Sequence, residues 1–395
     1  MTELFPVYEV GSDPKLPARV KAFGGRQIKD ADIRQIRLLA QIAKIDASEA
    51  IEVFEKYSRE RKELTPEERA VIIDTNAKLN LGLQYQAGLN FVYDGETRRT
   101  EMYDHQARRI EGFLPFPEMI RSRRWDSYWK HSCVGELRLK AGSVDELVRE
   151  FKFADEHSSA PLHVPLDDPF MVANMSSNPY YMKKLAPQFE NDPGQLKYEA
   201  KKALTLALAE NVVRPQVEAL VDAGAKWIQL DIPSATIDLM QIPILVEGIN
   251  AVVDGIDGIK FSLHICYPVR APGVPNKGYS LLFPDLLRLN PNVDHLSLEL
   301  ANNNRYEDDL AVFRKYADGR KFQIGAGVVD ITSENQKGDI KPASVRDRIL
   351  RAAKTLGDER LVYVAPDCGL RQVNYERVIK LYDSIVKGAE LARRG

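Results

Sequence analysis

Strand-like and helix-like segments alternate along most of this chain, and this alternation limits its fold more than any other feature. Short apolar runs typical of buried strands are bounded by turns, and most are followed by a longer segment of helical pattern. Eight strands are predicted in this way, at residues 5–12, 90–94, 162–166, 227–231, 261–266, 295–299, 322–330 and 361–364. Eight such units in 395 residues favour a TIM (β/α)8 barrel, with an open doubly wound sheet as the alternative.

Two regions interrupt the alternation. Residues 13–88 predict an inserted helical layer after the first strand, and a capping motif at 65–68 predicts a helix that ends at Gly88. Residues 113–142 are rich in aromatic residues and arginine, and we interpret them as a hairpin excursion. The arginines between Arg121 and Arg124 fit either a solvated rim or a docking surface. We expect residues 1–395 to form a single barrel domain.

Composition limits the partners of the chain. A net charge of −2 gives no electrostatic reason to expect nucleic acid or an anionic membrane. Three cysteines cannot form a disulfide framework, and sparse cysteines in an intracellular protein more often bind metals or take part in chemistry. No apolar run approaches the roughly 18 residues of a transmembrane helix, and the first residues lack a signal-peptide pattern. We expect a cytoplasmic protein.

Side chains that bind soft metals stand at the ends of predicted strands. His264 and Cys266 are two residues apart, so on a strand both point to one face. Cys368 follows the last predicted strand, and Glu299 ends the strand at 295–299. One nitrogen, two thiolates and one carboxylate suit tetrahedral zinc. The alternative is that both cysteines are small buried residues and that His264 is a hydrogen-bonded core residue.

The barrel places chemistry at the carboxyl ends of its strands. The groups predicted there are Ser12, Glu96, Asp231, His264, Cys266, Glu299 and Cys368. Zinc held by two thiolates carries little net charge, which suits binding a substrate thiol as its thiolate. The residues therefore predict alkyl transfer to a thiol. Glu96 and Asp231 would suit an ammonium group on that thiol, although each alone could equally be a helix cap or half of a salt bridge.

Two motifs, HICY at 264–267 and PDCGL at 366–370, resemble those of the zinc-dependent, cobalamin-independent methionine synthases, in their catalytic C-terminal barrel. DGE at 94–96 and IQLD at 228–231 extend the resemblance over nearly the whole chain. The resemblance implies a methyltransferase in which zinc is bound by His264, Cys266, Glu299 and Cys368. It implies that homocysteine contacts the Gly11-Ser12 turn, Glu96 and Asp231, and that His264, Cys266, Cys368 and Asp231 serve catalysis.

Three features depart from that family. We expect no second, N-terminal barrel, Ile232 replaces a glutamate, and Thr332 stands where the family places a proton-transfer histidine. Methyltetrahydrofolate has a poor leaving group that needs protonation, so we predict that the donor is methylcobalamin or a corrinoid protein, as in the short folate-independent core methionine synthases. His105 or His163 could replace the missing acid. The alternatives are alkyl transfer to another thiol, of the epoxyalkane:coenzyme M transferase type, and a non-catalytic zinc-binding subunit.

Overall fold

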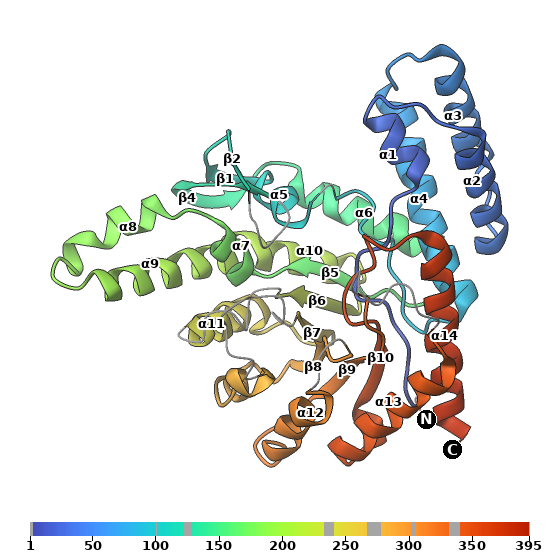
Figure 1. Cartoon of the computed structure of the whole chain (residues 1–395). Helices are drawn as coiled ribbons and strands as arrows, with labels where there is room; N and C mark the ends of the chain where they lie inside the picture. Colours follow the sequence, from blue (N-terminus) through green and yellow to red (C-terminus); the bar gives the residue numbers. More distant parts are fainter. Residues whose placement is uncertain are drawn as a thin grey trace.

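The computed structural model describes residues 3–99, 101–121, 128–232, 241–266, 278–301, 305–331 and 340–394 (Figure 1). Its centre is a parallel sheet whose strands lie side by side in chain order. They are β5 Val164–Asp167, β6 Trp227–Asp231, β7 Lys260–Ile265, β8 Val293–Leu298, β9 Gln323–Gly327 and β10 Val362–Ala365. This order is the one that a barrel of successive β/α units requires.

Two short segments occupy the two remaining positions of the barrel. Single parallel bridges join Val7 to Val364, Tyr8 to Phe91 and Val92 to Leu162. The backbone N–H of Tyr8 donates to Val364 at 3.0 Å, and that of Val92 donates to Pro161 at 3.1 Å. The predicted first and second strands therefore lie between β5 and β10, but as bridges instead of full ladders. The TIM-barrel prediction is confirmed, with a sheet that is itself open at this point.

Helices cover the outside of the sheet. They are α9 Pro193–Leu208, α10 Arg214–Asp222, α11 Ile242–Val253, α12 Tyr306–Lys315, α13 Pro342–Leu356 and α14 Tyr375–Arg394. A π-helical turn, Ala209–Val213, separates α9 from α10 just before Pro215, where the sequence predicts a break. None of the described helices combines the length and apolarity that crossing a bilayer requires.

Two parts of the helical prediction were wrong. The sequence pattern predicts a helix at 281–289, but this segment forms two 3-10 turns, Gly278–Leu282 and Asp285–Arg288, because Pro284 between them cannot donate to a continuous helix. The pattern also predicts Ser143 as the cap of a helix that ends at His157. Ser143 is instead the first residue of α6 Ser143–His157, and the residue before it, Gly142, caps that helix with φ 80° and no side-chain bond. Two short helices, α7 Pro169–Met175 and α8 Pro179–Leu185, were not predicted.

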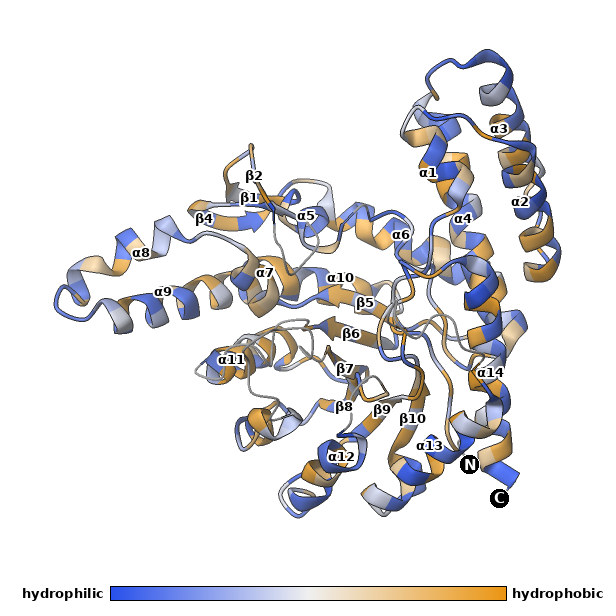
Figure 2. Cartoon of the chain, in the orientation of Figure 1, coloured by the Kyte–Doolittle hydropathy of each residue, from blue (hydrophilic) through white to orange (hydrophobic). Residues whose placement is uncertain are grey.

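Aromatic rings fill the interior of the barrel. The Trp227 ring lies 5.2 Å from Tyr8 and 4.5 Å from His163, measured between ring centroids. The Lys260 ammonium lies 4.1 Å from the Trp227 centroid and 3.7 Å from that of Tyr363. Apolar residues dominate the central strands (Figure 2). The interior is thus a packed core, so a ligand has access only at the rim.

The helical layer stands beside α14 (Figure 1). It consists of α1 Pro17–Phe23, α2 Asp30–Ala43, α3 Ser48–Glu60 and α4 Pro66–Ala87. Thr65 and Glu68 form the predicted capping box, and Gly88 ends α4 with φ 94°. Asp13 connects layer and barrel, because its carboxylate accepts from Tyr382 at 2.7 Å and from Gln84 at 2.7 Å.

The excursion begins earlier than predicted. The sequence pattern predicts a helix that continues to about Gly112, but the helix is limited to α5 Met102–Ala107. β1 Ile110–Phe113 already pairs with β4 Cys133–Leu139. A second ribbon pairs β2 Glu118–Ile120 with β3 Tyr128–Lys130. Of the arginine cluster, only Arg121 lies within the described residues. The division into one barrel with insertions at 13–88 and 113–142 stays a prediction.

Candidate metal and substrate site

Three predicted metal ligands meet at the carboxyl end of the sheet. His264 lies near the end of β7 and Cys266 directly follows it, while Cys368 lies in the loop after β10. Their ligand atoms all lie within 4.8 Å of one another. His264 Nε2 lies 3.0 Å from Cys266 Sγ, which lies 3.4 Å from Cys368 Sγ. The structure therefore brings together one nitrogen and two sulfurs from two distant parts of the chain.

These three groups fit a soft, four-coordinate metal ion. Two sulfurs bound to zinc at about 2.3 Å each would lie about 3.8 Å apart in tetrahedral geometry, close to the separation found here. The two sulfurs are within hydrogen-bonding distance, and this contact raises the pKa of Cys266 and lowers the pKa of Cys368. Metal ions bind the thiolate form of cysteine, so a lowered pKa at one of the two sulfurs is compatible with a ligand role.

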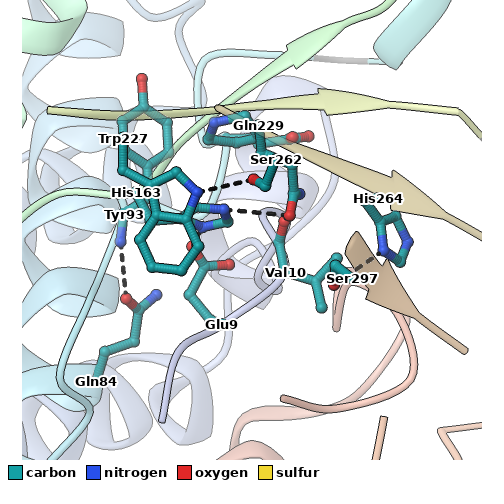
Figure 3. Close-up of polar contacts among 12 residues, drawn as sticks. Glu9, Val10, Gln84, Tyr93, His163, Trp227, Gln229, Ser262, His264 and Ser297 are labelled. Carbon is teal, nitrogen blue, oxygen red and sulfur yellow. Dashed lines mark hydrogen bonds and ion pairs between the residues drawn. The ribbon is translucent and has the colours of Figure 1, made fainter. Parts of the chain in front are cut away.

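Neighbouring groups fix the orientation of this cluster. His264 Nδ1 lies 3.3 Å from the Ser297 hydroxyl on β8 (Figure 3). This contact leaves Nε2 directed at the Cys266 sulfur. The Tyr279 hydroxyl donates to the Ile265 carbonyl at 2.8 Å and accepts from the Glu299 N–H at 2.9 Å. This hydroxyl therefore ties the end of β7 to the end of β8.

Glu299 lies next to the cluster but is not part of it. The trio of ligand atoms does not include its carboxylate, although its charge contributes to raising the pKa of Cys266. The loop that carries Glu299 is held by Asp367, whose Oδ1 accepts from the N–H groups of Leu300 at 3.0 Å and Ala301 at 2.7 Å. Asp367 directly precedes Cys368, so it links the two ligand-bearing loops.

The predicted head-group residues lie at the same rim. A Cβ added to Gly11 would lie 3.1 Å from Glu96 Oε1 and 3.3 Å from the Pro165 side chain, so a side chain at this position would crowd both groups. Ser12 lies next to the loop that carries Cys368. A Cβ added to Gly369 would collide with the Ser12 hydroxyl, and the Ser12 carbonyl accepts a hydrogen bond from the Leu370 N–H at 2.5 Å.

A tight turn positions Glu96. Its backbone is left-handed, with φ 54°, and its N–H donates to Asp94 Oδ1 at 2.8 Å. Arg99 pairs with Glu96 Oε1 at 2.9 Å and donates to the Pro165 carbonyl at 2.6 Å. Arg99 thus ties Glu96 to β5, an arrangement that the sequence prediction missed.

Asp231 ends β6 beside His264, its register partner on β7. Burial raises the pKa of Asp231 well above its usual range, and the charges of Glu96 and Asp167 add to the shift. Gln229 donates to Asp231 Oδ1 at 2.8 Å and to the Val10 carbonyl at 2.6 Å. Because the Gln229 amide nitrogen is used twice, its oxygen must accept from His163 Nε2, at 3.1 Å (Figure 3).

Burial holds His163 and His105 in the neutral form. It lowers the pKa of His163 to about 3 and that of His105 to about 3, so both rings are neutral near pH 7. His163 is completely buried in the barrel interior. That either ring supplies the missing acid stays a prediction. Ile232 is buried beside His264, with its N–H 2.7 Å from the His264 carbonyl, whereas Thr332, Tyr267 and Pro233 lie outside the described residues.

Comparison with known proteins adds independent findings. Residues 190–391 match the family model described as the catalytic domain of the cobalamin-independent synthases. A methionine synthase of Thermoplasma acidophilum is 31% identical over 310 residues, which cover 71% of this chain and 78% of that protein. Another, of Sulfurisphaera tokodaii, is 30% identical over 309 residues, which cover 78% of each chain.

Solved structures agree in fold. A B12-independent methionine synthase from a Shewanella species, in complex with selenomethionine, superposes with a TM-score of 0.72 at 18% identity, over 99% of this chain and 98% of that one. A putative counterpart from Listeria monocytogenes gives 0.61 at 18% identity, over 98% of each chain. The barrel and these relatives define an enzyme of the methyltransferase class. The chain belongs to the cobalamin-independent methionine synthase family.

Proposed function

We propose that this enzyme methylates the thiol of homocysteine to give methionine. The observation that carries the proposal is the adjacency of two unlike sites at one rim of the barrel. The soft cluster of His264, Cys266 and Cys368 adjoins the acidic pair of Glu96 and Asp231, and Asp231 is in register with His264. A substrate that carries both a thiol and an ammonium group would reach both sites. The relatives described as methionine synthases support this substrate.

We assign zinc to the soft cluster, with His264, Cys266 and Cys368 as ligands and Glu299 as the fourth. The two sulfurs and the imidazole favour zinc over a hard cation. Zinc bound there would lower the pKa of the substrate thiol and hold it as a nucleophilic thiolate. Glu299 would complete the ligand set by a small change in its side chain, since its loop is already fixed by Tyr279 and Asp367.

The chain's own residues would orient the amino acid. Asp231 and Glu96 would accept hydrogen bonds from its ammonium group. The Gly11-Ser12 turn would receive its carboxylate, because Gly11 leaves the backbone open and Ser12 lies beside the loop of Cys368. With both ends of the head group bound, the thiol is directed at the cluster. Such fixing of a nucleophile is a large contribution to catalysis.

We further propose that the methyl donor is a methylcorrinoid, which departs from the methyltetrahydrofolate that the family uses. The folate nitrogen must be protonated as the methyl group leaves, and general acid help is typically worth about 10²–10⁴-fold. Thr332 stands in the place of the family's histidine, and His105 and His163 are neutral near pH 7. Cob(I)alamin leaves without a proton, so it needs none of these groups.

The test is methyl transfer to homocysteine with methylcobalamin and methyltetrahydrofolate measured side by side. We expect the methylcobalamin rate to exceed the folate rate by at least about tenfold. Equal rates would refute the corrinoid donor but leave the acceptor intact. Coenzyme M as a second acceptor distinguishes methyl transfer to homocysteine from alkyl transfer to coenzyme M. We expect no transfer to coenzyme M, because Glu96 and Asp231 would repel its sulfonate. Transfer to coenzyme M but not to homocysteine would contradict the proposed function, and so would failure to bind any thiol.

A further inference from the structure

A third carboxylate, that of Asp167, lies near those of Glu96 and Asp231. Asp167 is the last residue of β5 and is in register with Asp231, the last residue of β6. Residues in register on parallel strands point to the same face of the sheet, so the two carboxylates are directed alike. Pro165, two residues earlier on the same face of β5, touches the position where Gly11 approaches Glu96. Asp167 therefore points toward the rim above that contact, where Glu96 and Asp231 lie.

One oxygen of the Asp167 carboxylate is buried and has no hydrogen-bond partner among the described residues. The residue is only 5% exposed, and the oxygen without a partner is Oδ1. Buried carboxylate oxygens are nearly always satisfied, because an unpaired one has lost its hydrogen bonds to water without replacement. The adjacent Asp168 shows the contrast, since its oxygens accept from the N–H groups of Phe170 at 2.8 Å and Met171 at 3.1 Å.

The charges around Asp167 are only partly balanced. Arg99 forms its hydrogen bonds with Glu96 and with the Pro165 carbonyl. Burial is the largest cause that raises the pKa of Asp167 and of Asp231, and the charge of Glu96 adds to both, whereas the charge of Arg99 lowers both pKa values. A ligand that brings a positive charge would add to the partial compensation that Arg99 provides.

We propose that Asp167 is a direct contact for the substrate ammonium and that, with Asp231 and Glu96, it restricts the acceptor to thiols that carry a primary ammonium group. This inference rests on the proposed function, methyl transfer to a thiol, and adds which thiols the enzyme accepts. A neutral thiol would leave the Asp167 oxygen unsatisfied. A sulfonate thiol would place a negative charge among three carboxylates.

The test compares Asp167→Asn with Asp168→Asn in the zinc-loaded, full-length enzyme. Each change replaces one buried carboxyl group by an amide, but the amide oxygen that Asp168→Asn introduces can still cap α7. The probes are homocysteine, its des-amino analogue 4-mercaptobutyrate, and cysteamine. The readout is the ratio of kcat/KM for homocysteine to that for 4-mercaptobutyrate within each variant. A ratio is unaffected by the fraction of enzyme that is folded.

We expect Asp167→Asn to lower this ratio by about ten- to a hundredfold, because a hydrogen bond to a charged group is lost, while Asp168→Asn leaves it unchanged. An unchanged ratio in Asp167→Asn would overturn the proposal. So would a wild-type enzyme that accepts 4-mercaptobutyrate as well as homocysteine, although that result would leave methyl transfer to homocysteine standing. An enzyme that uses cysteamine but rejects homocysteine would refute the proposed function and retain the ammonium contact, provided that Asp167→Asn selectively weakens cysteamine.

Discussion

The sulfur atoms of Cys266 and Cys368 lie 3.4 Å apart, although 102 residues separate them in the chain. Cys266 follows β7 and Cys368 follows β10, and β8 and β9 lie between these two strands in the sheet. Curvature of the sheet toward a barrel is what brings these two loops together. Neither motif could form the cluster in an open, flat sheet, and the metal site therefore depends on the barrel as a whole.

The zinc assignment predicts the effect of single cysteine changes. Purified enzyme should contain about one zinc per chain, and Cys266→Ser and Cys368→Ser should each lose most of it, because each removes a thiolate ligand. Cys133→Ser is the matched control. Cys133 is buried in β4 of the excursion, and burial raises its pKa to about 11, so its thiol stays protonated. Metal content by elemental analysis gives the answer, and full zinc in both Cys266 and Cys368 variants would refute the assignment.

The proposed contacts of Asp231 and Glu96 with the substrate ammonium predict selective losses in substrate binding. Asp231→Asn and Glu96→Gln should weaken homocysteine about ten- to a hundredfold, since each removes a charge-assisted hydrogen bond worth about 1.5–3 kcal/mol. Binding of 4-mercaptobutyrate should change far less. Calorimetric titration of both thiols into each variant measures the difference. If both ligands lost affinity equally, these carboxylates would not be hydrogen-bonded to the ammonium group.

Gln229 is predicted to act as a positioning residue for Asp231. Gln229→Leu would remove the donor to Asp231 and leave the Val10 carbonyl and His163 Nε2 unpaired in the core. We expect a stability loss of about 1–3 kcal/mol and a higher KM for homocysteine relative to 4-mercaptobutyrate. Gln106→Leu is the control, because Gln106 is bonded to Gln216 away from the site. A matching KM change in that control would mean that Gln229 acts only through stability.

Asp13 makes a prediction about pH. Burial raises its pKa from 3.8 to about 6, so the folded state binds a proton more tightly than the unfolded state does. Between those values the native protein carries more protons, and its stability must fall as pH rises from about 4 to 6. The contribution amounts to up to about 3 kcal/mol. Denaturant unfolding across this range should show the wild type losing stability relative to Asp13→Asn as pH rises. A constant difference would show that Asp13 does not titrate there.

Much of the architecture could be predicted because the chain repeats one pattern. Strands β6, β7, β8 and β10 lie within about two residues of their expected bounds, and α4 begins and ends at its predicted caps. The prediction failed where local pattern does not decide the structure. Residues 281–289 have a helical composition, but Pro284 breaks the hydrogen-bond ladder. The bridges at Val7 and Val92 depend on neighbours that are remote in sequence.

The candidate site was predictable to the extent that it lies at strand ends. His264, Cys266 and Cys368 lie together, as expected from the rule that active-site residues of a barrel lie at the carboxyl ends of its strands. Asp167 was missed because its strand was expected to end one residue earlier, at Leu166, and the same rule would otherwise have included it. The hydrogen bonds that join His163 to Gln229 and Gln229 to Asp231 could not be predicted, because they depend on which interior side chains face one another across β5 and β6.

The central claim is that the cluster holds zinc and that the zinc binds the homocysteine sulfur. Zinc-edge X-ray absorption of the enzyme, recorded with and without homocysteine, tests it most directly. We predict two sulfur ligands in the free enzyme and three after homocysteine is added, with one nitrogen or oxygen ligand displaced. A spectrum that is unchanged by homocysteine, or one that shows no sulfur ligands in the free enzyme, would contradict the account.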